Sequence, residues 1–134
     1  MEEIVMLGKL ATLAALACLA GPAAAQEVRG LFQTAPNDDG NVGHVEFYDC
    51  GGLTCGKLVR SFNAGGTPIE SPNVGRNIVW DMQDEGGGKF GKGKIWDPGA
   101  DKTYRSKMVL EGDQLKVSGC IGPICRANTW VRVR

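Results

Sequence analysis

The stretch KTYRSKMVLEGDQLKVSGC, residues 102–120, decides which fold class this sequence predicts. In its first half Tyr104, Met108 and Leu110 are set against Thr103, Arg105 and Lys107 at the intervening positions, and the alternation resumes after the Glu-Gly-Asp sequence at 111–113. Apolar residues at every second position are typical of a β-strand with one buried face, whereas a helix repeats them every three or four residues. Glycine flanked by acidic residues is typical of a tight turn. The stretch therefore predicts a β-hairpin.

The same two-residue period recurs along the chain, with clusters rich in glycine, proline and aspartate between the segments. Residues 63–76, which include Pro68 and Pro72, are the one long loop, and we expect this loop to lie over an open end of the fold. The pattern predicts no helix. It predicts eight strands, over residues 28–34, 44–48, 57–62, 78–82, 90–96, 103–110, 115–120 and 124–133.

Eight short antiparallel strands leave two unpaired edges unless their sheet closes on itself. An up-and-down barrel removes both edges at once. We therefore expect an all-β protein, built as an eight-stranded antiparallel β-barrel, in preference to a two-sheet sandwich.

The N-terminal residues resemble a secretory signal peptide. Lys9 precedes an apolar run, and three alanines at 23–25 form a small-residue cleavage site before Gln26. The apolar run is too short to span a bilayer, and no later segment could do so. We expect residues 1–25 to be removed, and residues 26–134 to form one periplasmic or secreted domain. The alternative is a lipid anchor at Cys18.

Composition argues against several functional classes. The chain has 15 basic and 15 acidic residues, so it lacks the charge excess typical of proteins that bind nucleic acid or anionic membranes. His44 is the only histidine, and no nucleophile-and-base motif accompanies it. Asp97 and Asp101 flank a Pro-Gly turn and are read as turn residues. We expect no catalytic residue, no metal site and no cofactor.

Four of the five cysteines lie beyond the leader, in two pairs that each enclose four residues. An even number of cysteines in an exported chain indicates disulfides. If each pair flanks a hairpin loop, its two cysteines meet whatever the overall fold, so we expect Cys50–Cys55 and Cys120–Cys125. A link between the pairs would restrict the unfolded chain more and is the alternative. The second pair fits the strand period only if a bulge intervenes or Trp130 points inward.

Several motifs, in order, resemble a bacterial exported family known as domain of unknown function 2147. They are Gly-Lys-Ile-Trp-Asp-Pro at 93–98, Lys-Thr-Tyr at 102–104, Leu-Lys-Val-Ser-Gly-Cys at 115–120 and Thr-Trp-Val-Arg-Val at 129–133. The resemblance implies a lipocalin-like barrel and no established activity. The sequence Gly-Leu-Phe at 30–32 resembles the opening of such barrels, with Phe32 where they have tryptophan. The resemblance further implies that the first and last strands pair, which would bring Phe32 to Arg132.

An eight-stranded barrel encloses either packed side chains or one small ligand. The proposed interior contains the aromatic and thioether side chains of Phe47, Phe62, Trp80, Trp96, Tyr104 and Met108. A packed core is the default reading of these residues, and a ligand-binding pocket is the alternative. We expect a protein that binds either a small apolar or amphipathic molecule in the barrel or another component of the cell envelope on its surface. The alternative is a structural or stress-related interaction module with a filled barrel, and a hydrolase is a third, less favoured reading.

Overall fold

The computed structural model describes residues 28–134, so the expected leader lies outside the described residues. The described residues contain nine strands: β1 (Gly30–Gln33), β2 (Val42–Cys50), β3 (Leu53–Phe62), β4 (Pro68–Ile69), β5 (Asn77–Gly86), β6 (Lys89–Asp97), β7 (Lys102–Glu111), β8 (Gln114–Ile121) and β9 (Ile124–Arg132).

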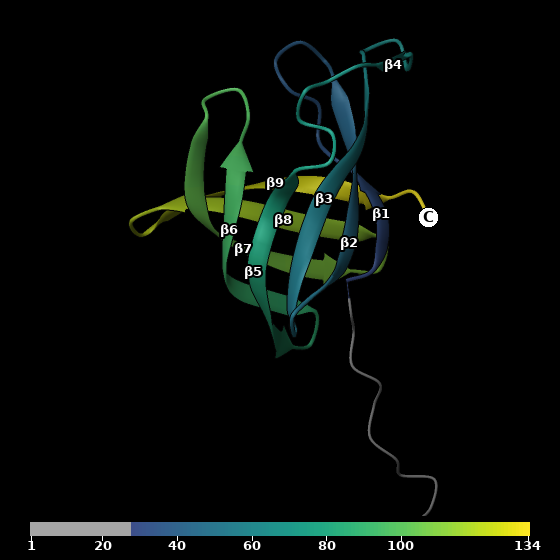
Figure 1. Ribbon diagram of the computed structural model, residues 1–134. Coiled ribbons are helices and arrows are strands. Elements are labelled where there is room, and N and C mark those ends of the chain that lie inside the picture. The colour runs from purple at the N-terminus through teal and green to yellow at the C-terminus, as the bar shows by residue number, and fades with distance from the viewer. Residues whose placement is uncertain (1–27) are drawn as a thin grey trace, which may run out of the picture.

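Eight of these strands close into the expected antiparallel barrel (Figure 1). From β5 to β9 each strand pairs with the next, β3 pairs with β5, and β2 pairs with both β1 and β3. The barrel closes where β1 pairs with β9, at Phe32 opposite Arg132 and Gln33 opposite Val131. The predicted number of barrel strands and their antiparallel order are confirmed.

The barrel interior is filled by one contiguous apolar cluster, which includes Phe32, Phe47, Met82, Met108 and Trp130. Some positions that face the interior are glycines. Because glycine has no side chain, the large side chains of neighbouring residues occupy the space that a side chain at that position would need. A Cβ atom on Gly56 would lie 2.9 Å from the Phe47 ring, and one on Gly93 would overlap the Met82 side chain. The glycines therefore make room for the large side chains, and the interior is packed in the way typical of a protein core.

The closing contact of the barrel is a cation–π pair, as the sequence resemblance implies. The Arg132 guanidinium lies 4.7 Å from the centre of the Phe32 ring, which is fully buried. Arg132 also donates a hydrogen bond of 2.6 Å to the Arg29 carbonyl and forms a 3.2 Å ion pair with Asp113. One side chain thus links the first strand, the last strand and the β7–β8 turn.

Both cysteine pairs form local disulfides, with Cα–Cα distances of 5.7 Å for Cys50–Cys55 and 4.0 Å for Cys120–Cys125. Cys120 and Cys125 lie directly opposite each other, as expected. Trp130 is 5% exposed and Val131 is 49% exposed, so Trp130 is the residue that points inward. With this orientation of β9, the strand period puts Cys120 and Cys125 on the same face of the sheet.

The first pair differs from the expected geometry, because β2 and β3 are joined by a two-residue turn and not by a four-residue loop. Cys50 therefore lies opposite Leu53, and Cys55 lies opposite Tyr48. The disulfide joins residues that are diagonal neighbours across the hairpin. Two successive glycines with positive φ at the turn allow this tighter connection.

The long loop departs from its expected course over the barrel mouth, because it runs back along the edge of β3. Its short strand β4 pairs Ile69 with Ser61 and Pro68 with Phe62. After a further excursion, Gly75 donates a backbone hydrogen bond to Leu58. The loop is therefore an extension of the barrel wall (Figure 1).

Replacing Phe32 with alanine should destabilise the protein by about 3 to 5 kcal/mol, because a cavity is added to the lost apolar and cation–π contacts. Chemical denaturation of the purified variant measures this change. The control is Val74→Ala, which shortens a side chain that is 44% exposed and should cost far less. A loss for Phe32→Ala below about 1 kcal/mol would contradict the role of this ring in closing the barrel.

Candidate functional site

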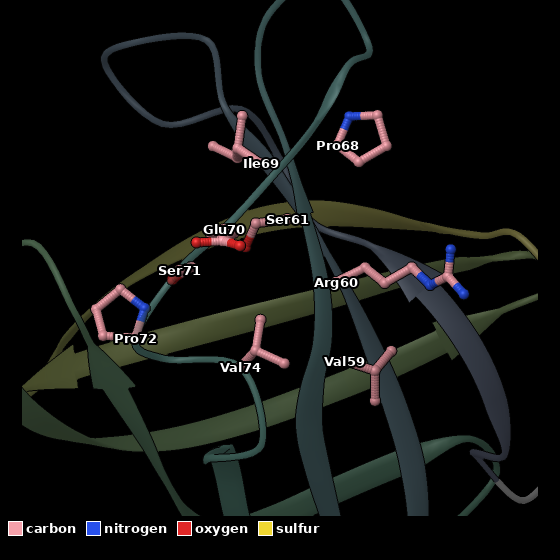
Figure 2. A pocket seen from close by; sticks show the side chains of 9 residues that line it. All are labelled: Val59, Arg60, Ser61, Pro68, Ile69, Glu70, Ser71, Pro72 and Val74. Carbon is pink, nitrogen blue, oxygen red and sulfur yellow. The ribbon is translucent and has the colours of Figure 1, made fainter.

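A groove of about 630 Å³ lies where the long loop leaves the edge of β3. The backbone of the loop is bonded to β3 at Ser61 and again at Leu58, and between these points it bows outward. Figure 2 shows that side chains from β3 and from the loop line the resulting space. They are Val59, Arg60, Ser61, Pro68, Ile69, Glu70, Ser71, Pro72 and Val74.

A second hollow of about 460 Å³ lies beside the first. Val59 and Arg60 line both hollows, and we call the two neighbouring hollows together the Arg60 groove. The register between β2 and β3 shifts beside these residues, which is the mark of a β-bulge. The second hollow is lined by Leu31, His44, Glu46, Val59, Arg60, Phe62, Val133 and Arg134.

The loop that walls the groove is held at both ends. At its start, the Asn63 side-chain oxygen accepts hydrogen bonds from the backbone N–H groups of Gly65 and Thr67, at 3.0 and 2.9 Å. At its end, the Arg76 guanidinium stacks 3.8 Å from the centre of the Trp96 ring. The Trp96 indole N–H in turn donates a 2.9 Å hydrogen bond to Asp101. The groove therefore has a wall that is fixed before any ligand arrives.

The lining of the groove is mostly apolar, and it includes a cationic side chain, that of Arg60, which both hollows share. Val59, Ile69 and Val74 offer aliphatic surface, and Arg60 contributes a permanently charged guanidinium. Glu70 brings an opposite charge to one end of the same hollow. A combination of apolar lining and a few polar groups is typical of small-molecule sites.

His44 lies in the second hollow and is held there by contacts on two sides. Its ring nitrogen Nε2 is 3.2 Å from the side-chain oxygen of Gln33, and its ring centre is 4.5 Å from that of Phe62. Burial lowers the pKa of His44 below its usual 6.5, and the positive charges of Arg60 and Arg134 lower it further. At neutral pH the histidine is therefore uncharged, and Arg60 is the stronger anion-binding group.

The six residues expected to line a ligand-binding interior are placed in different surroundings. Phe47, Trp96 and Met108 belong to the buried cluster, and Trp80 packs against its margin. Tyr104 is half-buried, and Phe62 lines the second hollow of the Arg60 groove. The first three are at most 8% exposed, so a ligand would reach them only if the cluster opened.

Most residues of the Arg60 groove were not singled out by sequence reasoning. The available signal was the pair of prolines in a loop that also carries Ile69 and Val74, since apolar residues in a long loop are unusual. Nothing in the strand period indicated the stack of Arg76 on Trp96. Asp101, read from the sequence as a turn residue, proves to fix the indole of Trp96.

Within residues 28–134 no helix is long and apolar enough to cross a membrane. No group of three or more histidine, cysteine or acidic side chains in this range is arranged to hold a metal ion.

The closed eight-stranded barrel, with its packed core and the groove in its wall, defines a lipocalin-like protein. The solved structure of protein HP1028 from the human pathogen Helicobacter pylori, which belongs to the lipocalin family, is similar, with a TM-score of 0.65 at 18% sequence identity. The similarity covers 81% of this chain and 84% of that protein.

Residues 30–132 match the family described as "Uncharacterized protein conserved in bacteria (DUF2147)", and the chain belongs to this family. Among curated proteins, none matches this sequence. The resemblance that the sequence motifs indicate is thus confirmed over nearly all of the described residues.

Changing Arg60 to glutamine should raise the pKa of His44, because one of the charges that disfavour its protonation is removed. A histidine with a lowered pKa in the folded state is protonated more readily in the unfolded chain. Its contribution to stability is therefore lost as the pH falls from about 6.5 toward the folded pKa. NMR titration of the His44 ring protons measures the shift.

The control for this titration is Arg126→Gln, which removes an exposed arginine on β9 and should leave the pKa of His44 unchanged. A titration midpoint of His44 at or above 6.5 in the unmodified protein would contradict the electrostatic description of the groove.

Proposed function

We propose that this protein is an exported binding protein that takes a small amphipathic molecule in the Arg60 groove. The apolar body of the ligand lies against Val59, Ile69 and Val74, and an anionic head group pairs with Arg60. The observation that carries the proposal is a groove that is open to solvent, has an apolar lining and a guanidinium, and is walled by a loop with anchored ends. The function is binding, with no chemical step.

The position of the ligand in the barrel wall, and not in the barrel interior, follows from the packing of the core. Lipocalin-like barrels of eight strands are just wide enough to hold one small ligand or to be filled by side chains. Here Phe47 and Met82 occupy space that glycines leave free. A ligand in the interior would have to displace these side chains, whereas the groove is open to solvent.

Export is supported by the two disulfides as well as by the signal-like N-terminal sequence. Disulfides persist in oxidising compartments such as the periplasm and are rare in the cytoplasm. The proposed location is therefore periplasmic or extracellular, with cleavage near Ala25.

A filled barrel that acts as an interaction module of the cell envelope is the second candidate. The continuous buried cluster favours it, because such a core gives rigidity without a ligand. A long exposed segment on β9 offers a surface for a macromolecular contact. An interaction module needs no ligand in the Arg60 groove, whereas the proposed binding protein does, so a test of ligand binding distinguishes the two functions.

N-terminal sequencing of the protein isolated from its host should give a chain that begins at Gln26 or within a residue of it, because the small-residue site ends at Ala25. A chain that begins at a lipid-modified Cys18 would contradict both the cleavage site and the soluble export.

Binding of 8-anilinonaphthalene-1-sulfonate, an apolar probe with an anionic group, should be weakened by about ten- to a hundredfold in Arg60→Gln, since a charge-assisted hydrogen bond contributes about 1.5 to 3 kcal/mol. Val59→Glu should abolish binding, because Val59 lines both hollows. Fluorescence titration measures both effects.

The matched controls are Lys107→Gln and Val109→Glu, which make the same kinds of change on β7, outside the groove. Unchanged probe binding in both Arg60→Gln and Val59→Glu would contradict the proposed site. Native mass spectrometry of protein purified from its own periplasm would identify a retained ligand by its added mass.

A further inference from the structure

The β8–β9 hairpin extends away from the body of the barrel, and its outer strand has an unpaired edge (Figure 1). β9 pairs with β8 along its whole length, but β1 pairs with it only at Arg132 and Val131. The six residues from Ile124 to Thr129 are all exposed. Within the described residues, no strand lies beside this part of β9.

The position of the disulfide shows which backbone groups are free. Cys120 and Cys125 lie opposite each other with a Cα–Cα distance of 4.0 Å, which is the spacing of a non-hydrogen-bonded pair. The N–H and C=O groups of Cys125 therefore point away from β8. By the alternation of an antiparallel ladder, those of Ala127 and Thr129 do the same.

This edge lacks the devices that keep strand edges apart. Proteins protect an exposed edge with proline, with several charges or with a bulge. Here the segment 124–129 has no proline and a single charge at Arg126, and its register with β8 has no irregularity. The Cys120–Cys125 disulfide ties the hairpin near its tip, so the edge is held extended.

We propose that this edge is a dimer interface, at which β9 pairs antiparallel with β9 of a second copy of the chain. The two-fold axis passes through Ala127, so that Ala127 faces its own counterpart and Cys125 faces Thr129 of the second copy. By symmetry the pair of Cys125 with Thr129 occurs twice, once on each side of the Ala127 pair. These three pairs exchange about six backbone hydrogen bonds. The two barrels then share one continuous sheet.

The argument for a second copy is the self-complementarity of the strand in this register. Arg126 lies opposite Asn128 of the second copy, so the only charge in the segment meets a neutral amide and not another arginine. The apolar tip of the hairpin, with Ile124 67% exposed, reaches the body of the second barrel. The outer edge of Val131 is taken by Gln33 of β1, so the pairing between the two copies ends at Thr129.

The proposed register predicts how charged substitutions at position 127 affect dimerisation, because residue 127 is the one position that lies opposite the same residue of the second copy. In Ala127→Lys two like charges lie across the axis, and in Ala127→Asp the same holds with the opposite sign. Each variant alone should dimerise at least about tenfold more weakly than the unmodified protein. A one-to-one mixture should restore the dimer, since lysine then faces aspartate. Analytical ultracentrifugation over micromolar to millimolar concentrations measures each association.

Two further variants separate backbone pairing from side-chain effects. Ala127→Pro removes the outward N–H group and should give a monomer, whereas Ala127→Val keeps it and should dimerise. Thr103→Lys places the same positive charge on an exposed strand residue of β7 and should leave the dimer intact. Circular dichroism of each variant confirms that the barrel is folded.

A monomeric unmodified protein at all concentrations would overturn the proposal. So would full dimerisation of Ala127→Lys, or a mixture of the two charge variants that associates no better than either alone. Binding of an added extended peptide to a monomeric chain, blocked by Ala127→Pro, would assign the edge to a foreign strand and would equally overturn pairing with a second copy. The measurement does not involve the Arg60 groove, so its outcome is independent of ligand binding.

Discussion

The whole structure depends on the seam where β1 meets β9, because a sheet of eight strands becomes a barrel only if its two ends join. That seam is short, with two paired positions in the ladder and backbone hydrogen bonds of 2.7 to 3.3 Å between Leu31 and the residues that follow β9. Arg132 strengthens it from within by covering the Phe32 ring and binding the Arg29 carbonyl. The core residues are enclosed only because this seam holds.

The barrel strands could be predicted from the sequence because each has one face in the core and one in solvent, which gives the two-residue period. β4 could not, since Pro68 and Ile69 are both exposed and leave no alternation to detect. A filled interior was one of the two outcomes that the sequence left open, and the sequence could not decide between it and a ligand cavity. Large aromatic residues suggest a lined cavity, and only the structure shows that Gly56 and Gly93 lie beneath Phe47 and Met82 and give them room.

The Arg60 groove is a product of backbone geometry more than of residue type. It exists because the chain leaves the edge of β3 after Ile69 and returns at Gly75, and because a bulge between β2 and β3 lies beside Val59 and Arg60. Neither event has a signature in the local sequence. The contact of Phe32 with Arg132, by contrast, joins the two ends of the domain and was predictable from the resemblance to a family in which the first and last strands pair.

The two disulfides have a consequence for the order in which the chain folds. Each joins cysteines only five positions apart in sequence, within one hairpin, so each can form once its own hairpin has formed. The seam between β1 and β9 instead unites segments about a hundred residues apart, whose loop-closure entropy is much larger. Covalent linkage can therefore precede closure, and the chain can oxidise its hairpins without trapping a wrong barrel.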